Sequence, residues 1–206
     1  MSKKLTLKIA QKFLKGGRVR LKDYTSIEAD AATALAKFKG GLDLPGLRSL
    51  DASAARALSK HCEDLDLFGL KKLSDDVAHA LAKHKGPLGL SGLESLSDAA
   101  AQALGKHKGD LYLNGLTSLS EAAAQALGKH EGYLGLCCLT SLSDSSGHVA
   151  LARKLAKHEN LDLRGLTSLS DAAAQALGKH ERNLSLSGLT SPVSYTHLTL
   201  PTNREV

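Results

Sequence analysis

The chain has 206 residues, of which 42% are hydrophobic and 3% aromatic, and it contains no tryptophan. This composition is typical of an ordered chain that buries a core, and no apolar run approaches the ~20 residues of a membrane span. Three cysteines cannot form a disulfide framework, which indicates a reducing compartment. The basic start MSKKLTLKIAQKFLKGG has no sustained apolar core and is a poor signal peptide. We therefore expect a cytoplasmic protein without a membrane span, and we exclude collagen and secreted disulfide-rich proteins.

Positive charge is concentrated at the N-terminus. A nucleic-acid-binding face would carry cations along the whole structure and aromatic side chains for stacking, so we expect no specific nucleic-acid partner. Two interpretations of this end remain open: a solvated polar cap of the fold, or a docking site for phosphates or anionic lipid. The formal net charge is +6, and residues 1–22 contain no acid but eight basic residues, Lys3, Lys4, Lys8, Lys12, Lys15, Arg18, Arg20 and Lys22.

Residues 1–18 are predicted to form a basic cap helix. The stretch LTLKIAQKFLKGG (5–17) is similar to the helical half of the segments that follow it, because Gln11 and Phe13 align with Gln102 and Leu104 if one residue is dropped near the exit turn. Capping units of repeat proteins are atypical and polar on their outer side, and the lysines supply that polarity.

A repeat fills residues 19–191, as seven complete copies and a truncated eighth. Its consensus is LxLxGLxSLSDAAAQALGKHKGx. The first positions are 23 residues apart at every step except the step of 27 residues from Leu134 to Leu161. These first positions are Val19, Leu42, Leu65, Leu88, Leu111, Leu134, Leu161 and Leu184.

Each repeat combines two periodicities. The alternation LxL predicts a short strand, and the Ala-rich segment predicts a short helix with Leu and Ala on one face. In four repeats a serine stands where an N-cap is needed, and an acid follows it at the positive end of the helix dipole. Lys, His and then Gly suit the other end. The expected caps are Ser97, Ser120, Ser143 and Ser170, followed by Asp98, Glu121, Asp144 and Asp171.

One repeat alone cannot bury both its strand leucines and its helix leucine. Ordering the chain costs about 1–2 kcal/mol per residue in backbone entropy, and only the stacking of neighbouring repeats offsets that cost. The sequence therefore predicts an α/β solenoid, with parallel β-strands on the concave face and short α-helices on the convex face.

These repeats resemble leucine-rich repeats, in particular the short bacterial type, and the resemblance covers residues 19–191. The family pattern LxxLxLxxNxL is not fully kept, because Leu93 and Leu116 stand where the family has Asn. The usual Asn ladder is thus missing. We hypothesise that a serine column replaces part of it by bonding backbone groups of the neighbouring turn. That column consists of Ser26, Ser49, Ser95, Ser118, Ser141 and Ser168.

Two segments break the pattern. Repeat 134–160 has extra residues around SSGHV (145–149), for which a helix longer by ~1.4 turns and a loop followed by a helix both remain open. Such an insertion marks either a working surface or a tolerated convex bulge. Residues 192–206 carry no repeat leucines in register and resemble a translated sequencing adapter, so we interpret them as a non-native tail. The natural C-terminus and any further domain are then expected to lie beyond it.

The sequence contains no GxSxG, HExxH, CxxC or phosphate-binding Gly loop, so we expect no enzymatic activity, no catalytic residue and no cofactor. Cys137-Cys138 occupies the x-Gly position of other repeats, which indicates small residues tolerated in a turn or, alternatively, a vicinal redox pair. Histidines recur at one repeat position, but helices pack about 8–10 Å apart while zinc ligands lie within roughly 2.1 Å of the ion. We therefore expect a structural column and no metal. The column consists of His61, His84, His107, His130, His158 and His180.

The outward side chains of the strands vary between repeats, whereas the helix sequences are nearly constant. Because strand side chains alternate, the variable positions point away from the leucine core, and we expect a partner to bind there. The chain is expected to be a monomeric, non-enzymatic interaction scaffold or recognition module for a protein or peptide. Two alternatives are anionic-surface binding through the N-terminus, and targeting of an enzyme whose catalytic domain is missing. The predicted partner-binding residues are Asp43, Asp66, Phe68, Tyr112, Asn114, Asp162 and Arg164.

Overall fold

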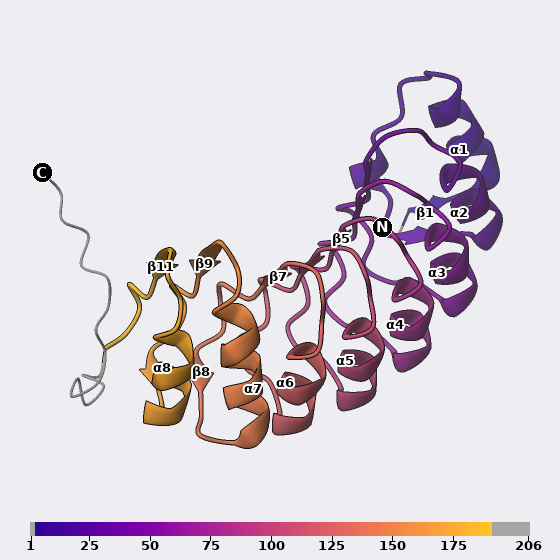
Figure 1. The fold of residues 1–206 in the computed structure, drawn as a ribbon. Coiled ribbons are helices and arrows are strands. Elements are labelled where there is room, and N and C mark those ends of the chain that lie inside the picture. Colours follow the sequence, from indigo (N-terminus) through magenta and orange to yellow (C-terminus); the bar gives the residue numbers. More distant parts are fainter. Residues whose placement is uncertain (1–2, 191–206) are drawn as a thin grey trace, which may run out of the picture.

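The computed structural model describes residues 3–190. In that range eight α-helices alternate with short parallel strands, so the chain is an α/β protein built of repeated strand–helix units. The units follow one another along an arc, with the helices on its outer side and the strands on its inner side (Figure 1). No helix among these residues is long and apolar enough to cross a bilayer. The segment 192–206, interpreted above as a non-native tail, lies outside the described residues.

Most of the helices are seven residues long, close to two turns. Alanines on their inner faces are buried, for example Ala100 and Ala101 at 0% exposure, and small side chains there let adjacent helices pack closely. The helices are α1 (Leu7–Leu14), α2 (Ala29–Leu35), α3 (Ala52–Leu58), α4 (Asp75–Leu81), α5 (Asp98–Leu104), α6 (Glu121–Leu127), α7 (Ser146–Leu155) and α8 (Asp171–Leu177).

The inner strands contain the LxL segments. β3 to β7 form one five-stranded parallel sheet in sequence order, and β9 pairs with β11 in a separate ladder. The register joins equivalent residues of successive repeats, as in Leu65 with Leu88 and Leu88 with Leu111. These strands are β3 (Leu42–Asp43), β4 (Leu65–Asp66), β5 (Leu88–Gly89), β6 (Leu111–Tyr112), β7 (Leu134–Gly135), β9 (Asn160–Asp162) and β11 (Asn183–Ser185).

A second set of strands lies just before the helices. β1 pairs with β2, and β8 pairs with β10, again in parallel. The pair β8–β10 spans the irregular repeat, where β7 and β9 are not paired with each other. The second set consists of β1 (Lys4–Leu5), β2 (Ser26–Ile27), β8 (Ser141–Leu142) and β10 (Ser168–Leu169).

The expected first strand at Val19 is wrong. Residues 19–20 are irregular, and Leu21–Asp23 forms a 3₁₀ turn instead. The preceding unit offers no inner strand on that side, because β1 belongs to the second set and pairs with β2. An LxL strand here could pair on one side only, with the edge strand β3, and it does not form. Val19 and Leu21 are only half-buried.

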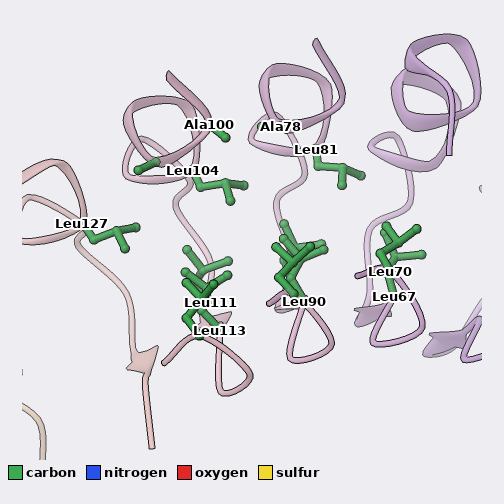
Figure 2. Close-up of a cluster of buried hydrophobic side chains, with 14 of the residues drawn as sticks. Leu67, Leu70, Ala78, Leu81, Leu90, Ala100, Leu104, Leu111, Leu113 and Leu127 are labelled. Atoms are coloured by element: carbon green, nitrogen blue, oxygen red, sulfur yellow. The ribbon is translucent and has the colours of Figure 1, made fainter. Parts of the chain in front are cut away.

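The core lies between the strands and the helices. Each regular repeat contributes the two LxL leucines, a third leucine after the glycine, and the helix leucine. In the unit around β6 these are Leu111, Leu113, Leu116 and Leu127, all at 0% exposure. Figure 2 shows the strand leucines stacked in register beneath the helices. Burial of each leucine stabilises the fold by about 1.5–3 kcal/mol, and the third leucine occupies the place where the resembled family has Asn.

Helix capping follows the sequence, with one exception. Ser97 and Ser120 accept the backbone N–H of Ala100 and Ala123 at 3.0 Å, and Ser170 caps α8, which confirms three of the predicted caps. The prediction for Ser143 is wrong. The inserted residues delay the start of α7 to Ser146, so that Ser145 is the cap, and the Ser143 hydroxyl lies 2.7 Å from His148 Nδ1 instead.

The insertion combines the two alternatives raised by its sequence. Residues 143–145 are irregular with a bend at 144–145, and α7 then runs for 10 residues, longer than its neighbours. Gly147 lies in its first turn, where an added Cβ would be 2.1 Å from the Glu121 carbonyl oxygen. The missing side chain therefore lets α7 pack against α6.

The serine column does not replace the Asn ladder. None of its six hydroxyls forms a hydrogen bond within residues 3–190. Three threonines one position earlier, Thr25, Thr140 and Thr167, do donate such a bond to the preceding repeat. Thr140 Oγ1 donates to Thr117 O at 2.9 Å, and Thr167 Oγ1 donates to Thr140 O at 3.2 Å. Ser118 is exposed to solvent, so water satisfies its hydroxyl and the hypothesis for this column is wrong.

Candidate functional site

The inner strand face is the candidate site. Four predicted residues, Asp43, Asp66, Tyr112 and Asp162, occupy the outward positions of β3, β4, β6 and β9. The other three, Phe68, Asn114 and Arg164, lie two residues further on, in the turn after each strand. The leucines that flank them are buried on the opposite side. β5 and β7 carry Gly89 and Gly135 at the outward position, so bare backbone separates the side chains of the face.

The N-terminal part of the face is acidic. Asp43 and Asp66 are direct partners across β3 and β4, and Asp66 Oδ1 accepts the backbone N–H of Phe68 at 3.2 Å. Partial burial raises the pKa of Asp66, and the charge of Asp43 adds to the rise, while the bond from Phe68 lowers it. The Asp66 carboxylate lies over Gly89, where an added Cβ would be 2.6 Å from Oδ1. The two carboxylates therefore lie next to each other with open backbone beside them.

Phe68 is the apolar residue of this region. It is 42% exposed, and it belongs, with Leu7 and Leu14 of α1, to the large hydrophobic side chains that are exposed within residues 3–190. Core packing does not use its ring, so Phe68 is available for contact with a partner.

Tyr112 is part of an aromatic chain that the sequence reasoning missed. Its ring centroid is 5.6 Å from that of Tyr133, which is 4.9 Å from His158. Burial raises the pKa of Tyr112, followed by the charges of Asp110 and Asp64. Tyr133 stands directly before β7, at the last repeat position, which is Asp110 in the previous copy. A comparison of that column between repeats could have revealed it.

Asn114 has a structural role. Its Oδ1 accepts the backbone N–H of Cys137 at 3.2 Å, one repeat further on. An added Cβ at Gly135 would lie 2.8 Å from this same oxygen. The Asn114 side chain therefore connects two turns by a hydrogen bond and has less freedom to bind a partner.

Asp162 and Arg164 form an ion pair within one repeat. Arg164 Nε lies 3.0 Å from both carboxylate oxygens, and Nη2 lies 2.7 Å from Oδ2. Hydrogen bonding to Arg164 lowers the pKa of Asp162. The Arg164 side chain is 67% exposed, and exposed pairs of this kind contribute at most about 1 kcal/mol to stability. The C-terminal part of the face thus presents an oriented guanidinium.

The histidine column runs through the exit turns of the helices. The rings of His61, His84, His107 and His130 are nearly parallel, at 4°, with centroids 6.1–6.2 Å apart, and each is at most 2% exposed. Burial lowers the pKa of His84, His107 and His130. Among residues 3–190, no three His, Cys, Asp or Glu side chains are placed to hold a metal ion together.

No protein-family model and no curated protein matches this chain.

Proposed function

We propose that the chain is a leucine-rich-repeat solenoid that acts as a non-enzymatic scaffold and binds a protein or peptide through its inner strand face. Its buried frame is nearly constant, as in the segment AAAQALGKH at 99–107, 122–130 and 172–180. The outward strand positions, in contrast, differ from repeat to repeat.

The exposure of Phe68 beside the Asp43–Asp66 pair is the observation that carries this proposal. A hydrophobic ring left in water gains free energy when a partner covers it, and aromatic residues dominate binding hot spots. The neighbouring carboxylates favour a partner with a cationic side chain next to an apolar one.

The size of the face favours a peptide. The seven inner strands, at about 4.8 Å spacing, span roughly 30 Å, and three strand residues give a width of about 10 Å. The resulting face of roughly 300 Å² is below the ~800 Å² per partner of a stable interface between globular proteins. An extended peptide that lies along the arc fits this area better.

A peptide-display selection against the reduced chain tests the proposal. For a selected peptide, the double variant Phe68→Ala with Tyr112→Ala should weaken the affinity by about 30-fold or more, the loss of one hot spot of ~2 kcal/mol. The matched control is Gln102→Ala with Gln125→Ala, two exposed residues on α5 and α6. Loss of binding in the control, with full binding in the face variant, would exclude the inner face.

The N-terminal helix supports a second candidate, the binding of an anionic surface. Leu7 and Leu14 are each 37% exposed. Lys8, Lys12 and Lys15 line a shallow hollow of about 510 Å³ together with Ile9, Gln11 and Gly17. An exposed helix with lysines beside apolar residues suits the interface of an anionic lipid bilayer.

Vesicle sedimentation separates this candidate from peptide binding. Phosphatidylserine vesicles should bind the chain at low salt and release it at high salt, while phosphatidylcholine vesicles should not bind it. Lys8→Ala, Lys12→Ala and Lys15→Ala together should abolish the binding. Removal of the same charge elsewhere, with Lys83→Ala, Lys106→Ala and Lys129→Ala, should leave it intact. An equal loss of vesicle binding in the two triple variants would contradict a site on α1.

A further inference from the structure

We propose that Cys137 and Cys138 form a two-thiolate site for a thiophilic divalent cation of the zinc and cadmium class. Both residues lie in the turn between β7 and β8, and their sulfur atoms are 3.8 Å apart. This proposal departs from the expectation that the chain holds no metal.

The separation of the sulfur atoms suits one tetrahedral ion. Zinc–thiolate bonds are about 2.3 Å long, and two such bonds at a tetrahedral angle place their sulfurs about 3.8 Å apart. The observed pair has that separation already, so an ion can bridge it without a change of the backbone. Soft thiolates also favour this class of ion over magnesium or calcium.

A disulfide between the same residues would be strained. Consecutive Cα atoms across a trans peptide are about 3.8 Å apart, whereas relaxed disulfides need a Cα separation of about 4.4–6.8 Å. An oxidised pair would therefore be easily reduced. In the reducing compartment expected for this chain, the dithiol is the form available to a metal.

The packing of the fold gives no reason for a cysteine at position 138. Other repeats have glycine there, and an added Cβ at Gly115 would lie 2.3 Å from the Ser91 carbonyl oxygen. The next repeat is equally tight, because an added Cβ at Gly165 would lie 2.7 Å from the Cys137 carbonyl oxygen. Cys138 thus departs from the glycine of the neighbouring repeats, and its exposed thiol is the group that the proposed site would use.

The surroundings leave the site accessible. Cys138 is exposed and Cys137 is half-buried. Because the cation must displace both thiol protons, we expect it to bind more tightly as the pH rises. Two protein ligands leave two tetrahedral positions for water.

Titration of the reduced chain with Cd²⁺ tests the site. We expect one ion per chain, with the ultraviolet charge-transfer absorption of a cadmium–thiolate bond, and competition by Zn²⁺. Cys138→Gly restores the glycine of the other repeats, so the turn should fold. The affinity for Cd²⁺ should nevertheless fall by at least about tenfold, because loss of even an outer-shell partner of a metal ligand usually costs that much. Cys137→Ser should do the same.

Cys62→Ser is the matched control, because Cys62 is an exposed thiol outside the pair. This variant should bind like the wild type. Unchanged binding in Cys138→Gly would place the ion elsewhere, for example on histidine, and would overturn the proposal. A stoichiometry of half an ion per chain, together with a dimer in analytical sedimentation, would also overturn the proposal. One ion would then be shared by thiolates of two molecules.

Discussion

Ser97 Oγ donates a 2.5 Å hydrogen bond to Asp75 Oδ1, one repeat back. Ser97 Oγ also accepts the backbone N–H of Ala100. Ser120 is bonded to Asp98 in the same way, and Ser146 donates to Glu121 Oε1 at 2.8 Å. The acids at the starts of α4, α5 and α6 thus each join their helix to the next one, in addition to their interaction with the helix dipole.

This double role predicts that Ser97→Ala destabilises the fold more than Ser74→Ala. Ser97 loses a cap and a charge-assisted bond, together about 2 kcal/mol. Ser74 forms a single, longer cap of 3.4 Å to Val77 N, and its loss should cost about 1 kcal/mol or less. Urea unfolding of both variants measures the difference. Equal midpoints would show that the bond to Asp75 adds nothing.

The threonine bonds predict a contrast between two neighbouring columns. Thr140→Val removes the hydroxyl that donates to Thr117 O while it keeps the shape, so it should cost about 1 kcal/mol. Ser118→Ala removes an exposed hydroxyl without a partner among residues 3–190, so its effect should stay within about 0.5 kcal/mol. The denaturant midpoints of the two variants provide the measurement. A larger loss for Ser118→Ala would restore the serine hypothesis.

The histidine column predicts that acid destabilises the fold. Burial and then the charges of Lys154 and His130 lower the pKa of His158 to about 4. In the unfolded chain histidine has a pKa of about 6.5, so the unfolded state binds protons first as the pH falls. Stability should therefore be full above pH ~6.5 and decrease progressively toward pH ~4.

Unfolding midpoints measured between pH 7.5 and 4 check this prediction. His107→Gln should reduce the pH dependence, because it removes one buried titrating ring. His79→Gln is the control, since His79 is exposed and lies outside the column. Carboxylates contribute to the profile of every variant alike, and a slope unchanged in His107→Gln would contradict the prediction.

The interruption between β7 and β9 predicts an uneven pattern of hydrogen exchange. Leu113 N–H donates to Gly135 O, and Leu163 N–H donates to Ser185 O, both at 2.9 Å. The equivalent amide of Leu136 has no such backbone bond within residues 3–190. Its exchange should therefore be faster than that of Leu113 and Leu163, because unbonded amides need less opening. Uniform protection of all three amides would show a continuous sheet.

The strand–helix alternation could be predicted from the sequence, for a local reason. Period-two leucines next to Ala-rich segments recur eight times, and a helix start needs only a serine whose oxygen reaches its own backbone. Ser97, Ser120 and Ser170 therefore followed the prediction. Ser143 did not, because the inserted residues 145–149 that follow it move the start of the helix. No other repeat carries this insertion, so the other copies could not show where the helix begins.

Contacts between repeats were decided by the tertiary structure. Thr140 and Ser118 belong to neighbouring repeat positions, and both carry a hydroxyl. Only the way in which successive repeats stack places the threonine hydroxyl within reach of a carbonyl of the adjacent repeat. Val19 has the pattern of a strand, but within residues 3–190 no inner strand precedes it, and β3 is the first strand of the inner sheet. The 3.8 Å between the sulfurs of Cys137 and Cys138 depends on two side-chain rotations that the order of residues leaves free. The sequence determined the repeating unit because that unit is local, whereas the ladders and the candidate site depend on distances across 23 or more residues of chain.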